Sequence, residues 1–274
     1  MKDVRGKRVL ITGGARGIGF CTAEEFARAG AELVITDINQ EGLEEAAGKL
    51  RDHGVVVHFR VVDVSSRKQV RELAKWVVEE LGGLDILINN AGIGHHGEVA
   101  ETTLKTWDKL VAVNLIGPLN HIYAFLPHFQ DKRDGHIVNV SSGQVFFRLP
   151  TWGAYTAIKA ALGAVSEVMH YELRKYGIKV TTVYPFMVNT PFYANIPGET
   201  WGGKLAMQLV PYYSMTPEKV GRIIYKAVCK EAKVEMVSIL NDFGFYLQFV
   251  PLAPAIVALV SNYFLAKKVE KAAA

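Results

Sequence analysis

The sequence predicts one α/β domain in which a parallel sheet of about seven strands is covered by helices on both faces. Two observations predict this fold class. Short apolar runs alternate with segments of helical length from residue 8 to residue 240, and such alternation is typical of parallel strands joined by crossover helices. No linker rich in Pro, Gly or Ser and no internal repeat interrupts the series, so we expect residues 1–240 to form a single doubly wound domain.

The elements alternate regularly over the first third of the chain. We expect strands at the β-rich apolar runs 8–12, 32–36, 55–62 and 84–88. We expect helices at the intervening segments 19–29, 42–53 and 68–81. Parallel strands have their carboxyl ends at the same edge of the sheet, and ligands of such sheets bind at that edge. The residues that follow each strand are therefore the first candidates for a site.

The rest of the domain continues the pattern with three further strands. Helical periodicity covers 106–129, where Pro118 predicts a kink or a break. It also covers 155–176, which ends at Gly177 as a natural C-cap. A third helix begins at Thr216, which is followed by proline at the first helical position. The remaining strands are expected at 135–140, 178–183 and 234–240.

Two segments depart from this alternation. Residues 186–216 are rich in Asn, Pro, Gly and aromatic residues, which suggests a lid-like insertion that covers a substrate. Residues 241–274 form an apolar C-terminal extension, in which Pro251 and Pro254 argue against a membrane-spanning helix. Its stretch 243–268 ends in lysines and could lie on a membrane surface, pack in a subunit interface or cover the substrate pocket. These three interpretations stay open.

Charge and cysteine content exclude several classes of protein. The 274-residue chain has a net charge of +4, but its basic residues are spread among acids, so we expect no nucleic-acid partner. Its two cysteines, Cys21 and Cys229, belong to no CxxC or Cys/His cluster, which argues against a disulfide scaffold and a metal site. Charges interrupt the apolar residues near the N-terminus, so we expect no signal peptide and a cytoplasmic location.

A glycine-rich turn lies between the first expected strand and the first expected helix. It has the sequence TGGARGIG at residues 12–19. Glycines in this position let the backbone turn tightly and approach a pyrophosphate, whose charge is met by the N–H groups and the dipole of the helix N-terminus. The turn therefore predicts a Rossmann-type dinucleotide site that includes Gly13, Arg16, Gly17, Ile18 and Gly19.

Residues at the ends of the next strands extend this site. Asp37 closes the second strand, where a carboxylate can accept hydrogen bonds from the adenosine ribose and repel a 2′-phosphate. This favours NAD, although Arg16 could pair with that phosphate, so NADP stays open. Asp63 and Val64 close the third strand, where a carboxylate can receive the adenine amino group. The fourth strand ends in Asn-Asn-Ala-Gly at 89–92, where small residues let the backbone pass close to a ribose.

Four residues carry the predicted chemistry. Tyr155 and Lys159 are four residues apart, so both lie on one face of a helix. An adjacent ammonium stabilises a phenolate and lowers the pKa of the phenol, which otherwise lies near 10. Ser142, at the end of the fifth strand, can hydrogen-bond the carbonyl or alkoxide oxygen as charge develops on it. Asn114, in the preceding helix, could hold a water that links Lys159 to solvent.

Together these motifs resemble those of the classical short-chain dehydrogenases/reductases: TGxxxGxG at 12–19, NNAG at 89–92, a helix asparagine at 114, and Ser142 with YxxxK at 155–159. The resemblance covers roughly residues 5–240. In this family Pro-Gly normally follows the sixth strand; here Phe186 replaces that glycine, while Val188 and Thr190 keep their places for the nicotinamide carboxamide. The implied cofactor-binding residues are Gly13, Arg16, Gly17, Ile18, Gly19, Asp37, Ile38, Asp63, Val64, Asn90, Ala91, Gly92, Tyr155, Lys159, Pro185, Val188 and Thr190.

A narrower resemblance concerns the substrate. The form PxxVNTxF at 185–192, the segment Asp-Ile-Asn at 37–39 and the apolar C-terminus resemble the lipid-droplet 17-beta-hydroxysteroid dehydrogenases and related retinol dehydrogenases. Aromatic residues also flank the catalytic segments, which predicts an apolar pocket for a steroid, retinoid, long-chain or aromatic alcohol. The substrate-contacting residues we expect are Ser142, Gln144, Tyr155, Phe186 and Phe192.

The sequence thus predicts an NAD-dependent oxidoreductase that interconverts a hydrophobic alcohol and its ketone, and we expect a homodimer or homotetramer. An NADP-dependent carbonyl reductase and a non-catalytic nucleotide-sensing protein on the same fold stay open as alternatives, as does an epimerase or dehydratase. The intact set of Asn114, Ser142, Tyr155 and Lys159 favours catalysis over sensing.

Overall fold

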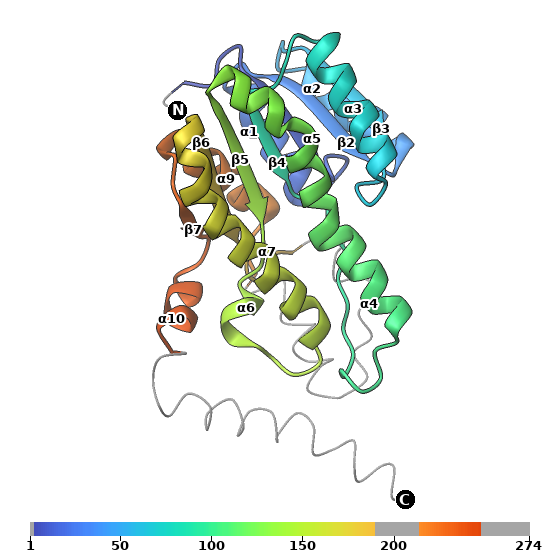
Figure 1. Cartoon of the computed structure of the whole chain (residues 1–274), viewed down its shortest axis with the longest axis vertical. Coiled ribbons are helices and arrows are strands. Elements are labelled where there is room, and N and C mark those ends of the chain that lie inside the picture. Colours follow the sequence, from blue (N-terminus) through green and yellow to red (C-terminus); the bar gives the residue numbers. More distant parts are fainter. Residues whose placement is uncertain (1–2, 190–213, 248–274) are drawn as a thin grey trace, which may run out of the picture.

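The computed structural model describes residues 3–189 and 214–247, and the strands within these residues form one sheet (Figure 1). The strand order is β3-β2-β1-β4-β5-β6-β7, and all neighbours are parallel. The strands are β1 Arg8–Thr12, β2 Glu32–Asp37, β3 Val57–Val61, β4 Ile86–Asn89, β5 Gly135–Val140, β6 Ile178–Tyr184 and β7 Val234–Met236. The order reverses between β1 and β4, which creates a crevice at the carboxyl edge. The predicted fold class is confirmed.

Helices cover both faces of this sheet. Several begin with a side-chain cap: Asn39, Ser66, Thr103 and Thr216 each accept a hydrogen bond from a backbone N–H in the first turn. In the described part of the chain the helices are α1 Gly17–Arg28, α2 Gln40–Arg51, α3 Arg67–Glu79, α4 Leu104–Val111, the π-helix η1 Ala112–Ile116, α5 Gly117–Lys132, α6 Gln144–Phe147, α7 Gly153–Glu172, the 3₁₀ helix η2 Leu173–Tyr176, α9 Pro217–Lys230 and α10 Ile239–Leu247.

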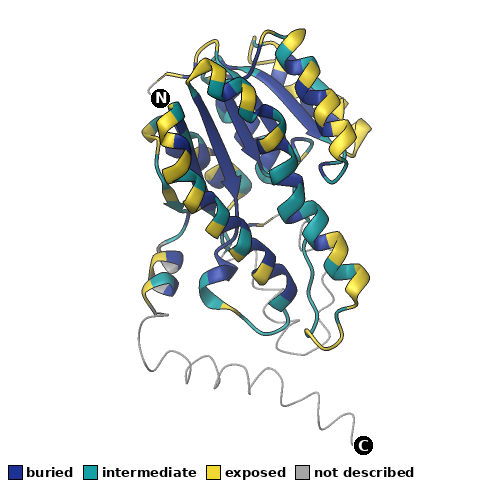
Figure 2. Cartoon of the chain, viewed as in Figure 1, coloured by how far each residue is buried: buried dark blue, intermediate teal, exposed yellow. Residues whose placement is uncertain are grey.

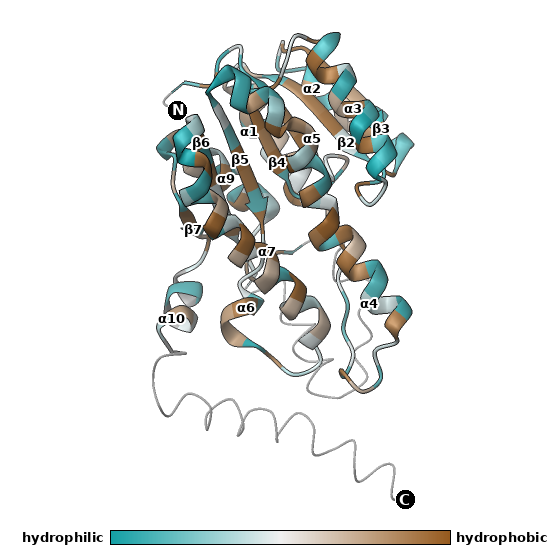
Figure 3. Cartoon of the chain, in the orientation of Figure 1, coloured by the Kyte–Doolittle hydropathy of each residue, from teal (hydrophilic) through white to brown (hydrophobic). Residues whose placement is uncertain are grey.

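Two apolar layers, one on each face of the sheet, form the core. Val9 and Ile11 of β1 pack in the layer that contains Phe26 of α1, whereas Leu10, between them in sequence, packs in the layer that contains Phe125 of α5. All five side chains are fully buried, and the central strands β4 and β5 are dark blue in Figure 2, while β2 and β4 are largely brown in Figure 3. Successive side chains of a strand point to opposite faces. A strand that is buried on both faces is therefore apolar along its interior, and polar residues are found where it ends.

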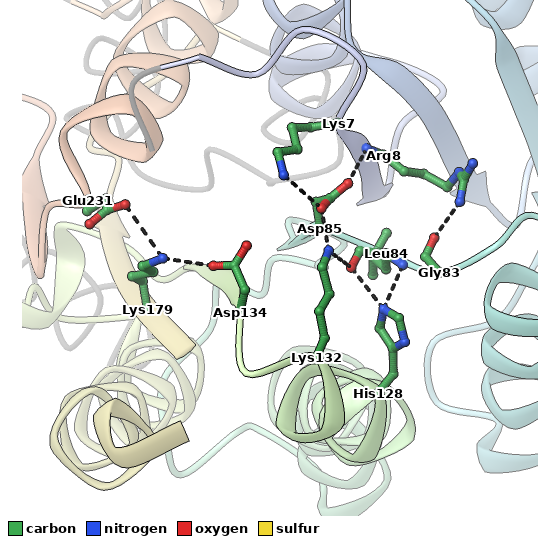
Figure 4. Close-up of polar contacts among 10 residues, drawn as sticks. All are labelled: Lys7, Arg8, Gly83, Leu84, Asp85, His128, Lys132, Asp134, Lys179 and Glu231. Carbon is green, nitrogen blue, oxygen red and sulfur yellow. Dashed lines mark hydrogen bonds and ion pairs between the residues drawn. The ribbon is translucent and has the colours of Figure 1, made fainter. Parts of the chain in front are cut away.

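The amino edge of the sheet is held by an ion-pair cluster that lies away from the predicted site (Figure 4). Asp85 accepts hydrogen bonds from the backbone N–H of Arg8 at 2.8 Å, from Lys7 Nζ at 3.3 Å and from Lys132 Nζ. Burial alone would raise the pKa of Asp85, but the hydrogen bonds from Lys132 and Arg8 outweigh burial and hold the pKa below its ordinary value. The cluster ties β1, β4 and the end of α5 together.

The helix expected at 106–129 is one continuous helical stretch, Leu104–Lys132, with a π turn at Ala112–Ile116. Pro118, two residues after this turn, has no N–H to donate to the carbonyl of Asn114, four residues earlier, so the regular α-helical pattern cannot pass through it. The stretch is apolar and long enough to cross a membrane. Its inward face, which includes Ile122 and Phe129, is buried against the sheet instead.

The strand expected at 234–240 is wrong in its second half. β7 ends at Met236, and α10 begins at Ile239 and continues past residue 240. The run is mostly apolar, and an apolar run of this length does not distinguish a strand from a buried helix. The backbone N–H of Asn241 bonds Ser238 O at 2.8 Å, which turns the chain into the helix. The four-residue helix α6 was not expected from the sequence.

Two predicted segments fall largely outside the described residues. Of the lid-like segment 186–216 the structure describes only 186–189 and 214–216, and of the stretch 243–268 only 243–247. The lid, the membrane contact and the subunit interface stay predictions.

Candidate active site

The glycine-rich turn and the Asn-Asn-Ala-Gly segment are bonded to each other at the carboxyl edge of β1 and β4. Thr12 Oγ1 accepts hydrogen bonds from the backbone N–H groups of Asn90 and Ala91, both at 3.0 Å. In return, Asn90 Nδ2 donates to Thr12 O at 3.0 Å and to Gly13 O at 3.2 Å. These bonds hold the two predicted cofactor segments together without any ligand.

The turn itself has room for backbone only. Gly13 and Gly17 have φ values of +67° and +60°, which L side chains rarely adopt. A Cβ on Gly19 would lie 2.0 Å from Gly13 O and 2.6 Å from Asn90 Nδ2. Ile18, between them, opens the first turn of α1, and Arg16 is its extended N-cap. Gly17 and Gly19 thus leave the backbone N–H groups at the N-terminus of α1 uncovered by side chains of their own. A pyrophosphate can approach these groups, so the turn fits a dinucleotide.

Acidic residues lie at the carboxyl ends of β2 and β3, the strands that follow β1 on one side of the sheet. Asp37 ends β2, and its carboxylate accepts hydrogen bonds from Ala15 N at 3.4 Å and Asn39 N at 3.1 Å. Ile38, next to it, is 73% exposed. Asp63 follows β3, and its Oδ1 accepts from both the backbone and the hydroxyl of Ser65. The carboxylate of Asp37 therefore lies within hydrogen-bond distance of the glycine-rich turn.

Lys159 and Tyr155 meet beneath the end of β5. The ammonium nitrogen of Lys159 is 6.0 Å from the centre of the Tyr155 ring and donates to Val140 O at 2.9 Å. Both side chains are buried, with 4% and 6% of their surface exposed. Burial lowers the pKa of Lys159 to about 8, because a charged form loses its hydration in the interior. Ser142 follows β5 and is also buried.

Asn114 lies in the π turn and holds the loop after β4. Its Oδ1 accepts from Ile93 N at 3.0 Å, and its Nδ2 donates to Ile93 O at 2.9 Å. A Cβ on Gly92 would lie 2.7 Å from Asn114 Oδ1 and 3.5 Å from Lys159 Nζ. The structure thus brings Asn114, Gly92 and Lys159 to one place, although they are distant in the sequence.

The loop after β6 has its left-handed residue one position after Phe186, which replaces the family's glycine. The left-handed residue is Met187, with φ +51°, and not Phe186. Pro185 O accepts a hydrogen bond from Gly143 N at 2.7 Å. The ring of Phe186 stacks on the ring of Phe147, with the ring centres 4.5 Å apart. Val188 pairs with Met215 in a β-bridge. Thr190 and Phe192 lie outside the described residues.

Gln144 lies at the start of α6, two residues after Ser142. Its side chain is buried, and its Oε1 has no hydrogen-bond partner among the described residues. A buried amide oxygen without a partner is uncommon. The side-chain oxygen of Gln144, a predicted substrate residue, could therefore accept a hydrogen bond from a bound molecule.

Two residues of the site, Ser141 and Thr151, carried no sequence signal. Ser141 Oγ donates to Lys159 O at 2.8 Å, and Thr151 Oγ1 lies 2.7 Å from His96 Nε2. Thr151 also has φ +69°, which is strained for a β-branched residue. Trp152 meets the Tyr155 ring edge to face at 5.8 Å. Only hydroxyl or aromatic side chains next to the motif residues could have pointed to these contacts.

Comparison with known proteins gives consistent matches. A family model described as short chain dehydrogenase matches residues 7–200. An uncharacterised oxidoreductase from Staphylococcus saprophyticus is 34% identical over 206 residues, which cover 74% of this chain and 86% of that protein. Estradiol 17-beta-dehydrogenase 11 from Pongo abelii is 39% identical over 197 residues, which cover 71% of this chain and 66% of that protein.

Solved structures match over most of the chain. A short chain dehydrogenase/reductase from Burkholderia phymatum in complex with NAD has a TM-score of 0.83 and 25% identity, and the match covers 90% of this chain and 94% of that one. The apo form of LigD from Sphingobium sp. strain SYK-6 has a TM-score of 0.77 and 30% identity, with 93% and 98% covered.

Proposed function

Because the chain belongs to the short-chain dehydrogenase family, we propose that it transfers a hydride between NAD and a hydrophobic alcohol or ketone, with Tyr155 as the proton-transfer residue. One observation carries this proposal: the buried ammonium of Lys159 lies 6.0 Å from the ring of Tyr155, at the sheet edge that also holds the glycine-rich turn. Burying an unpaired charge costs free energy of folding, and titratable groups buried in this way cluster at functional sites. A buried ammonium beside a phenol can stabilise the phenolate.

The residues around the edge divide the work of holding a dinucleotide. The N–H groups at Gly17–Gly19 would meet the pyrophosphate, Asp37 the adenosine ribose and Asp63 the adenine amino group. Asn90, Ala91 and Gly92 would let the backbone pass the nicotinamide ribose, and Pro185, Val188 and Thr190 would hold the carboxamide. The nicotinamide ring, when bound, supplies the hydride acceptor or donor.

The chain's own chemistry is a proton transfer coupled to that hydride transfer. Tyr155 takes the hydroxyl proton of the alcohol, and the Lys159 ammonium stabilises the phenolate that makes this possible. Ser142 donates a hydrogen bond to the oxygen as charge develops on it. The side chain of Asn114 holds Ile93, and Asn114 would also hold the water that links Lys159 to solvent.

The cofactor proposed is NAD rather than NADP, and Asp37 is the residue that tests it. Asp37→Ser removes the carboxylate that would bind the ribose hydroxyls and repel a 2′-phosphate. We expect NAD to bind about tenfold more weakly, since a hydrogen bond to a charged group contributes roughly 1.5–3 kcal/mol, and NADP to bind more tightly. Fluorescence titration with NADH and NADPH measures both.

Asp63→Ser is the matched control, because Asp63 lies on the adenine side and away from the 2′ position. It should weaken both cofactors to the same extent. A wild-type enzyme that prefers NADPH, or an Asp37→Ser variant with an unchanged preference, would contradict the proposed choice of cofactor.

The substrate proposed is a hydrophobic secondary or primary alcohol. Phe147 and Phe186 stack beside the loop that carries Ser142, and the relative named estradiol 17-beta-dehydrogenase 11 supports a bulky apolar substrate. An absorbance screen that follows NADH and NADPH over steroids, retinoids, fatty alcohols, aryl alcohols and polyols tests the proposal. Turnover confined to polyols would refute the substrate class, and no turnover with any alcohol or ketone would refute the reaction.

A further inference from the structure

The described part of the C-terminal segment, α10, packs directly behind the loop that carries Ser142. Its residue Asn241 is fully buried, although it is polar and lies outside every motif of the sequence. We propose that Asn241 is a positioning residue that holds the Ser142 loop against the end of β6 in the geometry that hydride transfer needs. This inference rests on the proposed function.

One side chain amide joins two walls of the site. Asn241 Nδ2 donates a hydrogen bond to Tyr184 O, at the end of β6, one residue before Pro185. On its other side, Asn241 Oδ1 lies against Gly143, where a Cβ would come within 2.3 Å of it. Gly143 follows Ser142 directly, so Asn241 contacts both the loop that orients the serine and the strand that leads to the nicotinamide side.

The same two walls are bonded to each other and to α10 at further points. Gly143 N donates to Pro185 O at 2.7 Å. A Cβ on Gly244, one helical turn after Asn241, would lie 2.7 Å from the ring of Phe147, and that ring stacks on Phe186. α10 therefore holds the end of β6 through a hydrogen bond, packs against Gly143 in the Ser142 loop, and reaches the loop after β6 through the ring of Phe147.

The geometry gives Asn241 influence over chemistry that it does not touch. Ser142 acts only if its hydroxyl is aimed at the reacting oxygen, and a displacement of about 1 Å in such a group can reduce a rate by about 100-fold. Ser141 is bonded to Lys159 O and Val183 O. Beyond Ser142, Gly143 has no side chain with which to fix the loop, so its position there depends on the hydrogen bond to Pro185 and on the packing of Asn241. The dinucleotide site at Gly13–Gly19 makes no contact with this helix that the structure describes.

The test is Asn241→Leu, which keeps the branching and approximate size of the side chain but removes the donor to Tyr184 O. We expect kcat to fall by about tenfold, equivalent to roughly 1.4 kcal/mol in the barrier, with the dissociation constant for NADH unchanged. The primary isotope effect on kcat with a carbinol-deuterated alcohol should rise, because hydride transfer becomes slower than product release. A merely structural loss would lower the active fraction and leave the isotope effect as it is.

Thr181→Val is the matched control. Thr181 is buried on β6, the strand whose end Asn241 contacts. Its hydroxyl donates to Ala232 O and lies 2.8 Å from His136 Nε2. Thr181 pairs with Val138 of β5, four residues before Ser142. Its loss should lower the melting temperature without changing kcat per NADH-binding site.

Gly244→Ala gives a second test if Asn241→Leu does not fold. It keeps Asn241 and favours the helix, but its methyl group presses on Phe147, so we expect a smaller fall in kcat of about threefold with the same rise in isotope effect. Wild-type kcat and isotope effect in both variants, with a wild type that turns over alcohols, would overturn this inference alone. A wild type without any turnover would instead overturn the proposed function.

Discussion

Replacing Tyr155 with Phe is expected to abolish turnover and to leave dinucleotide binding intact. The ring of Tyr155 is packed between Trp152, at 5.8 Å, and Lys159, at 6.0 Å. Phe keeps this packing and loses only the hydroxyl that exchanges a proton with the substrate. General acid–base catalysis contributes roughly 10²- to 10⁴-fold to a rate, so we expect kcat to fall by about 10³-fold. Stopped-flow turnover with the best alcohol of the screen and NADH titration measure the two effects.

Tyr184→Phe is the matched control for a lost phenol. Tyr184 ends β6 beside the same site, and burial raises the pKa of its hydroxyl to about 12. A phenol with so high a pKa is a poor acid or base at neutral pH, and the contact of Asn241 is with the backbone of Tyr184 rather than with its ring. We expect its kcat to change by less than about twofold. If Tyr155→Phe retained wild-type turnover, the proposed mechanism would be wrong.

The strands could be predicted because they are buried on both faces. Val9, Leu10 and Ile11 are all fully buried, so β1 is apolar at every position between Arg8 and Thr12, and the expected strand 8–12 agrees with its observed bounds. The ends of such strands must carry the polar residues, which is why the motif residues after β1, β2, β4 and β5 could be placed at one edge from the sequence. The family that these motifs resemble is confirmed by the family model and the relatives.

Contacts between distant segments could not be predicted in this way. Nothing in the sequence near Thr12 indicates that its hydroxyl accepts from Asn90, or that Asn114 clasps Ile93. These are pairs 78 and 21 residues apart, and they depend on how the sheet and the π turn bring the segments together. Phe186 also stands where the family normally has glycine, and the sequence did not indicate that the left-handed conformation falls on the next residue, Met187.

The apolar run at 234–240 shows a second limit. A strand and a buried helix satisfy the same hydrophobicity over seven residues, and the difference is decided by partners that the run itself does not contain. Tyr184 O and Gly143 provide those partners for Asn241. For this reason residues 239 and 240, which were expected to end a strand, instead begin the helix that carries Asn241.

Replacing Lys159 with Met is expected to reduce turnover strongly and to change how stability depends on pH. Without the ammonium the phenolate of Tyr155 loses its stabilising charge, so we expect kcat to fall by about 10²-fold or more. The same ammonium is costly to bury, and burial lowers its pKa from 10.5 to about 8 in the folded protein. Between these two values the unfolded chain binds more protons than the folded one, so the free energy of unfolding should rise with pH.

The rise should amount to about 3 kcal/mol, since each unit of pKa difference corresponds to about 1.4 kcal/mol. Urea denaturation at pH 7 and pH 11, which enclose both pKa values, measures it, and the Lys159→Met variant should lack it. Lys179→Met gives a control of opposite sign, because Asp134 and Glu231 outweigh the effect of burial and raise the pKa of Lys179. The stabilisation from Lys179 is present at neutral pH and disappears as pH rises through that raised pKa. An equal rise of stability in wild type and Lys159→Met would show that Lys159 is not the buried charge that the catalytic proposal requires.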